Sequence, residues 1–189
     1  MAQYVFPTEF VFHTKNTLHE QHKADLLPQI DQNLSNTEGP LSYCNVNTEY
    51  HYRTNKENQK KYFNLIHQSI LPSIDLMFSE IIGLRRLSNP MVTNIWYNHY
   101  SASEIAWQNI HAHYEGKYSG LYILKLEGSN TTMFFSQLAS IHGLTSPDLA
   151  TDFAAEGDIL LFPSSLCHYT LPIKQERIAI SFDINFTRY

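Results

Sequence analysis

The sequence is short of cysteine and of long apolar runs, and each shortage excludes a class of protein. Two cysteines in 189 residues, Cys44 and Cys167, are too few for the disulfide framework of a small secreted domain, so a reducing cytoplasm is the expected compartment. No apolar run approaches the roughly 20 residues that cross a bilayer, and the first residues lack the basic flank and apolar core of a signal peptide. We therefore expect a cytoplasmic protein without a membrane segment.

Basic residues are also scarce, because 13 Lys and Arg stand against 18 Asp and Glu for a formal net charge of -5. Proteins that bind nucleic acid broadly show a basic surface, so this balance argues against nucleic acid as a partner. The remaining composition is ordinary for a globular protein, with 43% hydrophobic residues and 12 tyrosines. A chain of this length is expected to form a single domain over residues 1–189.

The first part of the chain, residues 1–88, predicts supporting structure. Residues 56–82 have apolar residues three and four positions apart, which indicates a core-packing helix that Pro72 should kink or split. The Ser-, Asn- and Thr-rich stretch 35–54 is a candidate lid loop. The expected elements are an edge strand at 4–13, a surface helix at 17–33, the loop at 35–54 and the helix at 56–82.

The second part, residues 89–189, predicts a sheet. Short segments rich in Ile, Tyr, Phe and Thr are separated by turn-like clusters, without helices between them. This pattern is typical of an antiparallel sandwich or barrel and not of an α/β fold. The expected strands are 92–100, 105–113, 119–127, 131–136, 158–163 and 176–186.

Three histidines are the strongest indication of chemistry. His111 and His113 form a His-Ala-His triplet, and both share one face if this segment is an extended strand. His168 follows the apolar strand 158–163 and is the natural third ligand. Three ligands on one face of an iron ion leave open positions for oxygen chemistry. Ten histidines also make a chance His-x-His pair common, so the spacing alone leaves a surface or hydrogen-bonding role open.

Glu115 offers an alternative ligand set. It lies two residues beyond His113, so a continuing strand would bring it to the same face. His113, Glu115 and His168 would then form the common triad of two histidines and one carboxylate. Both ligand sets keep His113 and His168.

Arg177 begins the apolar strand 176–186, where a buried guanidinium needs a partner. Its planar fork binds a carboxylate through two parallel hydrogen bonds, which suits a dicarboxylic cosubstrate. Ser181, four residues on and on the same face, could add a hydroxyl. A salt bridge from Arg177 to one of the acidic residues of the chain is an equally open reading. The three candidate carboxylates are Glu156, Glu176 and Asp183.

Three segments together resemble the 2-oxoglutarate (2OG)/Fe(II)-dependent oxygenases of marine bacteria and cyanophages, in the prolyl-hydroxylase-like superfamily. That family shows His-x-His-Pro, then Ser-Gly-Val-Tyr-Tyr-Leu, and then Gly-x-Leu-Leu-Leu-Phe-Pro-Ser followed by a His, an Arg and a closing strand. The resemblance covers about residues 90–187, with Tyr114 in place of the proline and Ile123 in place of the second tyrosine. The matching segments are His111-Ala-His113, residues 119–124 and residues 157–186.

The resemblance implies a double-stranded β-helix (jelly roll, cupin-like), mainly β, with helices of the N-terminal half braced against one side. It also implies Fe(II) held by His111, His113 and His168, with Arg177 binding the distal carboxylate of 2OG as cosubstrate. We further expect Tyr122 to line the pocket and contact the cosubstrate, together with Ser181.

The expected function is therefore a 2OG- and Fe(II)-dependent dioxygenase that hydroxylates an unactivated C–H bond and releases succinate and CO2. The substrate would be a small molecule or a peptidyl side chain, and the oligomeric state is open, a homodimer included. Two alternatives are a cupin-like three-histidine metalloenzyme that does not use 2OG and a jelly-roll binding module without turnover.

Overall fold

A computed structural model describes residues 9–30, 44–50, 56–80, 90–141, 143 and 148–186 of the chain. Among these residues, no helix is both long and apolar enough to cross a membrane. The helices are α1 (His19–Leu26), a 3-10 turn (Leu27–Gln29), α2 (Lys56–Glu80) and α3 (Gln137–Ile141). The strands are β1 (Phe12–Lys15), β2 (Asn47–Thr48), β3 (Pro90–Tyr100), β4 (Ala106–His111), β5 (Tyr118–Leu126), β6 (Thr132–Phe135), β7 (Asp148–Ala150), β8 (Asp158–Pro163), β9 (Cys167–Ile173) and β10 (Arg177–Phe186).

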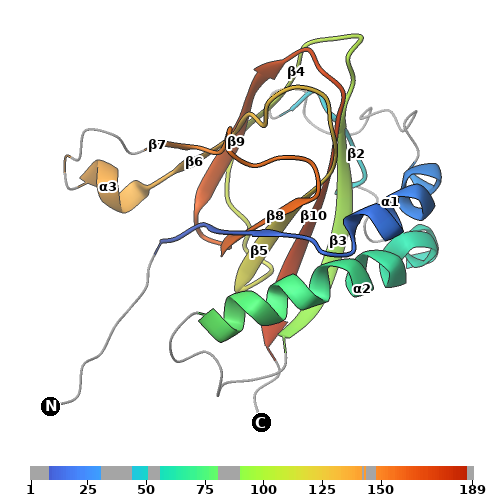
Figure 1. The fold of residues 1–189 in the computed structure, drawn as a ribbon. Coiled ribbons are helices and arrows are strands. Elements are labelled where there is room, and N and C mark those ends of the chain that lie inside the picture. The colour runs from blue at the N-terminus through green and yellow to red at the C-terminus, as the bar shows by residue number, and fades with distance from the viewer. Residues whose placement is uncertain are drawn as a thin grey trace, which may run out of the picture.

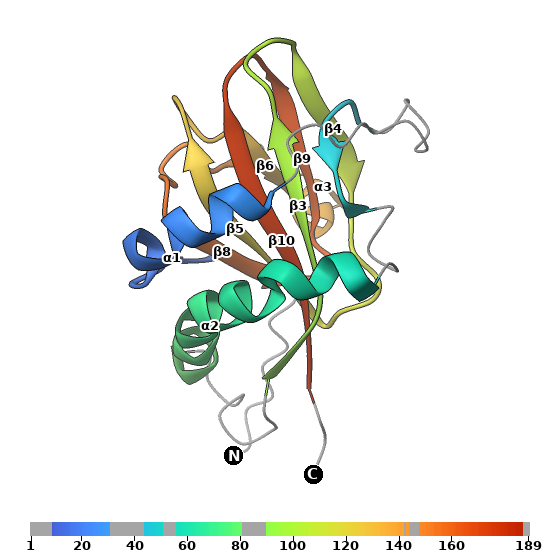
Figure 2. The same ribbon diagram turned by 90° about the vertical axis from the view of Figure 1, so that its right-hand side faces the viewer.

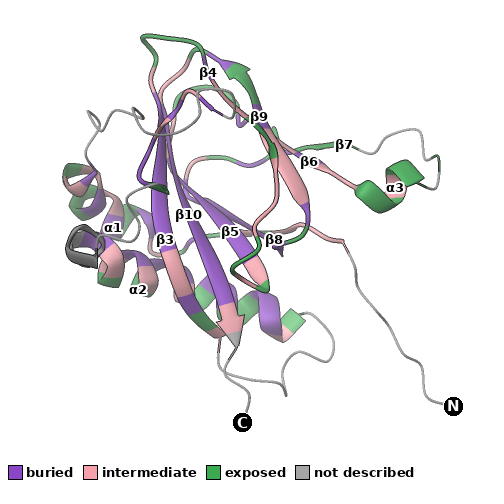
Figure 3. Ribbon diagram, turned by 180° about the vertical axis from the view of Figure 1, so that it is seen from behind, coloured by how far each residue is buried: buried purple, intermediate pink, exposed green. Residues whose placement is uncertain are grey.

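The strands form two antiparallel sheets, as the jelly-roll prediction requires. The larger sheet has the order β1-β8-β5-β10-β3-β2, and the smaller has the order β4-β9-β6-β7. Apolar side chains of both sheets meet in one cluster, which includes Leu121 and Leu160 of the larger sheet and Phe134 of the smaller. The two sheets therefore enclose an interior between them (Figures 1 and 3). The predicted fold class, mainly β with flanking helices, is confirmed.

Helices α1 and α2 cover the other face of the larger sheet (Figure 2). In β10, the side chains of Ile178, Ile180 and Phe182 join the cluster that includes Ile70 and Ile74 of α2. Side chains alternate between faces along a strand. The alternate residues of β10, which are Arg177, Ala179, Ser181 and Asp183, therefore point into the interior. Because the helices cover one face of the sheet, only the other face can carry a site.

Several predicted boundaries shift in the structure. The strand predicted at 105–113 ends at His111, and α2 runs through Pro72 without the predicted split. Within the predicted lid, residues 44–50 contain β2, which pairs with β3, so this part is an edge of the sheet. The remainder of 35–54, together with residues 4–8 of the predicted edge strand and the end of the helix predicted at 17–33, lies outside the described residues.

Candidate metal centre

His111, His113 and His168 lie together between the two sheets. Their candidate ligand nitrogens all lie within 4.8 Å of one another, and the rings of His111 and His168 have centroids 4.3 Å apart. Cross-strand pairing brings two of them together, because His111 of β4 is opposite His168 of β9. His113 follows the end of β4, and its backbone N–H donates to the carbonyl oxygen of Ser164 at 2.8 Å.

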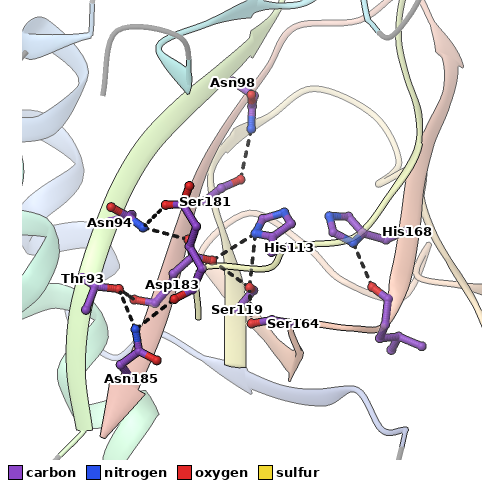
Figure 4. A network of polar contacts seen from close by, with 12 residues as sticks. Thr93, Asn94, Asn98, His113, Ser119, Ser164, His168, Ser181, Asp183 and Asn185 are labelled. Atoms are coloured by element: carbon purple, nitrogen blue, oxygen red, sulfur yellow. Dashed lines mark hydrogen bonds and ion pairs between the residues drawn. The ribbon is translucent and has the colours of Figure 1, made fainter. Parts of the chain in front are cut away.

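Each of the three rings has an acceptor at Nδ1. Nδ1 of His111 lies 2.7 Å from the backbone oxygen of Asn109, and Nδ1 of His168 lies 3.3 Å from that of Leu166. Nδ1 of His113 lies 3.0 Å from Oδ1 of Asp183 (Figure 4). A carbonyl or carboxylate oxygen accepts a hydrogen bond, so each Nδ1 carries the hydrogen and each Nε2 keeps its lone pair. Three Nε2 donors of this kind fit a divalent transition metal.

Burial keeps two of these histidines in the metal-binding form. It lowers the pKa of His111 to about 4, against the weaker raising effect of the Asn109 carbonyl. Burial, with the nearby His111 and His113, also lowers the pKa of His168 well below its ordinary value. Neutral imidazole is the form that binds metal, so neither ring has to lose a proton at neutral pH.

Arg177 is buried in the same interior, with 1% of its surface exposed. Its Nη2 donates to Oγ1 of Thr132 at 2.7 Å, and its guanidinium carbon lies 4.8 Å from the centre of the Tyr100 ring. Nε and Nη1 have no hydrogen-bond partner among the described residues. Burial lowers the pKa of Arg177. A buried cation with unpaired donors is costly, so the arrangement fits an anionic ligand that is yet to bind.

The acidic residues that could have paired with Arg177 pair elsewhere. Glu156 pairs with Lys23 and His19, and Glu176 pairs with His99 and Lys125. Asp183 pairs with His113. The salt bridge left open by the sequence is therefore not formed among the described residues, and the two free N–H groups of Arg177 remain available.

Two threonines of the smaller sheet relate the position of Arg177 to that of His168. Thr170 lies two residues beyond His168 in β9, and its hydroxyl is 3.0 Å from the Tyr100 hydroxyl. Thr170 is opposite Thr132, the partner of Arg177. The guanidinium and His168 therefore lie along one inner surface. Ser181 lies on it as well and accepts a hydrogen bond from Asn98 at 3.0 Å (Figure 4).

Residues 94–183 match the family model described as "Putative 2OG-Fe(II) oxygenase". This stretch contains all three histidines, Arg177 and Ser181. This part of the chain, 90 of its 189 residues, is thus similar to the 2OG-Fe(II) oxygenases. The predicted enzyme class, an oxidoreductase of the 2OG/Fe(II) dioxygenase type, is confirmed at this level. The family implies iron and 2OG. The three neutral Nε2 donors fit the iron, and Arg177, with unpaired donors, fits a carboxylate of 2OG.

Solved structures with low sequence identity share the fold. A prolyl-4-hydroxylase from Pseudomonas putida superposes with a TM-score of 0.58 at 13% identity, over 95% of this chain and 94% of that one. AviO1 from Streptomyces viridochromogenes has a TM-score of 0.58 at 13% identity, over 92% and 89% of the two chains. EctD from S. alaskensis with bound Fe has a TM-score of 0.52 at 10% identity, over 92% and 72%.

An oxidoreductase of the 2OG-Fe(II) oxygenase family from Burkholderia pseudomallei matches with 13% identity and a TM-score of 0.44. The match covers 58% of this chain, which spans half the length of that protein. No curated protein matches the sequence significantly. The matches therefore show the fold and a similarity of residues 94–183 to 2OG-Fe(II) oxygenases, while the substrate has to be argued from the site.

Glu115, the alternative ligand, is not brought to the histidines. It is exposed, and its Oε2 accepts a hydrogen bond from Nδ2 of Asn94 at 3.0 Å. Because β4 ends at His111, the strand that would have aligned Glu115 with His113 does not continue. The structure thus favours His111 over Glu115 as the third ligand.

Tyr122 is also placed away from the 2OG oxygenase site, so its predicted contact with the cosubstrate is not supported. Its neighbours Leu121 and Ile123 point into the interior, whereas Tyr122 points to the helices. Its hydroxyl lies 2.6 Å from Nδ1 of His19, and burial raises its pKa to about 12. The alternation of a strand explains the error, because only every second residue of β5 can face the site.

Replacing Tyr122 with phenylalanine should therefore lower stability and leave 2OG affinity unchanged. Loss of the buried hydrogen bond to His19 is expected to reduce the free energy of unfolding by about 1–3 kcal/mol. Urea unfolding and 2OG titration of the iron-loaded protein measure the two effects. A weakened 2OG affinity in a folded variant would indicate that Tyr122 contacts the cosubstrate, against this reasoning.

The metal-free protein should lose stability as the pH falls from about 6.5 to about 4. The pKa values of His111 and His168 are lowered in the folded state, so in this window only the unfolded chain takes up their protons. Stability then falls with falling pH. Urea unfolding at pH 7 and pH 5 measures the effect, and a variant with both histidines changed to glutamine should depend less on pH. Equal dependence in the two proteins would contradict this reasoning.

The sequence did not indicate the role of Asp183, which accepts a hydrogen bond from Nδ1 of His113. Burial alone would raise the pKa of Asp183, but hydrogen bonds from His113, Asn94 and Ser119 hold it below its ordinary value. One signal was available: Asp183 is six residues from Arg177 on the same strand, and an even separation places both on the inner face.

Proposed function

We propose that the protein is a 2OG- and Fe(II)-dependent dioxygenase that hydroxylates an unactivated C–H bond and releases succinate and CO2. One observation carries the proposal. Three imidazoles with free Nε2 atoms share an interior surface with a buried arginine that has two unpaired N–H groups. A metal site and a carboxylate site at two ends of one surface suit a keto-acid with a second carboxylate.

In this function, His111, His113 and His168 would hold Fe(II) through Nε2. Iron with bound 2OG would supply the oxidising power for the attack on the C–H bond. Arg177 would bind the far carboxylate of 2OG through donors of its guanidinium, of which Nε and Nη1 have no partner among the described residues. Its position is held by the hydrogen bond to Thr132 and by the Tyr100 ring.

Apolar side chains around His168 would keep bulk water from the reacting atoms. The Phe162 ring centroid lies 4.9 Å from that of His168, and the Phe134 ring centroid lies 5.7 Å from it. Both phenylalanines are buried and contact each other at 4.7 Å. A dry, apolar wall strengthens the charge interactions of the site and limits side reactions of the oxidant.

The substrate class follows only broadly. A prolyl-4-hydroxylase is among the structural neighbours, and a small-molecule or peptidyl substrate is compatible with the acidic overall charge of this chain. We infer one of these two classes and not a nucleic acid.

Succinate production tests the proposal. The iron-loaded protein would be incubated with ascorbate, O2 and 2OG, alone and with panels of amino acids, small metabolites and peptides. We expect slow succinate release without substrate and faster release with a member of a panel. If the iron-loaded protein releases no succinate under any condition, the cupin-like alternative becomes the better account, with Arg177 binding a carboxylate of the substrate itself.

A further inference from the structure

Asp183 is a buried carboxylate whose hydrogen bonds converge on one metal-binding histidine. It is 1% exposed and lies in the middle of the larger sheet, opposite Asn94 of β3 and Ser119 of β5. Oδ1 accepts from Nδ1 of His113 at 3.0 Å and from Oγ of Ser119 at 2.8 Å (Figure 4). Oδ2 accepts from Nδ2 of Asn94 at 3.1 Å.

No lysine or arginine among the described residues neutralises this carboxylate, and its partner His113 donates a hydrogen bond to it as a neutral ring. Burying an anion without a full counter-charge is expensive. For Asp183 this cost arises directly behind a histidine of the metal cluster.

The other two histidines have no such partner. The acceptors at Nδ1 of His111 and of His168 are neutral backbone carbonyls. The three Nε2 donors are therefore unequal, because only His113 is polarised by a full negative charge. A carboxylate behind a metal-binding histidine fixes the ring and makes it a stronger donor.

From this geometry we propose that Asp183 is a positioning residue for the metal site. Through its hydrogen bond to His113, it supplies the negative charge that a cluster of three neutral imidazoles lacks. A triad of two histidines and one carboxylate brings its negative charge directly to the ion. Here the charge would reach the ion through the His113 ring. The inference rests on the proposed iron site, and it deepens that proposal by assigning the charge balance of the site to Asp183.

Neighbouring groups hold the carboxylate in place. Ser119 donates to Asp183, and its oxygen can then accept from Oγ of Ser164 at 2.8 Å. A Cβ added at Gly116 would lie 3.0 Å from Cβ of Asp183 and 2.8 Å from the carbonyl oxygen of Tyr118, so the loop after His113 closes tightly over the network. Asp183 therefore has little freedom to turn away from His113.

Metal affinity without 2OG tests the inference. Co(II) and Zn(II) would be titrated against a competing chelator in wild type, Asp183→Asn and Glu115→Gln. Glu115 is the matched control, because it also accepts from Nδ2 of Asn94 but contacts no histidine of the cluster in the described structure. We expect Asp183→Asn to weaken metal binding about 10- to 100-fold and to change the Co(II) absorption spectrum. Glu115→Gln should remain near wild type.

Equal affinities and spectra in Asp183→Asn and Glu115→Gln would overturn the inference. Because 2OG is absent, this result is distinct from a failure of the proposed function, in which wild type binds metal but releases no succinate. A wild type that binds no divalent metal would overturn both.

If Asp183→Asn does not fold, NMR of the Zn(II)-loaded wild type gives the answer. The Nδ1 proton of His113 should be the furthest downfield of the three and the slowest to exchange. A His113 that binds Zn(II) through Nδ1 would contradict the inference.

Discussion

Replacing Arg177 with methionine should strongly weaken 2OG binding and leave the ligand-free protein at least as stable as wild type. Methionine is unbranched and uncharged, and its side chain ends at about the position of the arginine Nε. The substitution removes the cost of two buried N–H groups without partners, Nε and Nη1, and loses one hydrogen bond to Thr132 and the contact with Tyr100. A structural salt bridge would behave in the opposite way, because its loss destabilises the fold.

The expected loss of 2OG affinity is large. Removing one partner of a buried, hydrogen-bonded charge pair costs about 2–5 kcal/mol, or roughly 30- to 4,000-fold in the dissociation constant. Titration of the Fe(II)-loaded variant with 2OG measures this loss, and urea unfolding of the metal-free protein measures stability. Arg177→Lys, which keeps the charge but not the planar fork, should retain part of the affinity. A destabilised Arg177→Met variant with normal 2OG affinity would show that the arginine is structural.

Replacing His168 with glutamine should reduce metal affinity by more than about 100-fold, since a lost ligand outweighs the loss of a supporting hydrogen bond. His168, like His113, belongs to both ligand sets predicted from the sequence, and its ring lies 4.3 Å from His111 and 5.0 Å from His113, centre to centre. Chelator competition with Fe(II) or Co(II) measures the affinity.

The matched control for His168 is His67→Gln. His67 lies on α2, where its ring stacks on that of Phe63, and it is not part of the metal cluster. It should bind metal as wild type does. Near-normal metal affinity in a folded His168→Gln protein would exclude the three-histidine site.

The sequence predicted the jelly roll well because its long strands carry strong local patterns. Residues 92–100 and 176–186 were expected as strands and correspond to β3 and β10. β9 was missed because Cys167–Ile173 contains polar residues and Pro172 and has no apolar alternation. Its pairing with β4, which places His168 opposite His111, is a long-range contact that local patterns do not encode.

Two features of the site needed the structure. Tyr122 was expected in the site, and only the packing of α1 and α2 shows which face of β5 is interior. The role of Asp183 depends on a hydrogen bond to His113 across 70 positions of the chain. Histidine spacing could therefore indicate a metal cluster, while its charge balance and the partners of Arg177 depend on the three-dimensional arrangement.

The most direct test of the central claim is the visible spectrum of the protein with Fe(II) under anaerobic conditions, with and without 2OG. A keto-acid chelated to iron gives a weak charge-transfer band. We expect the band in wild type and expect it to be lost in Arg177→Met and in His168→Gln. Stoichiometric iron binding without a 2OG-dependent band in wild type would contradict the account.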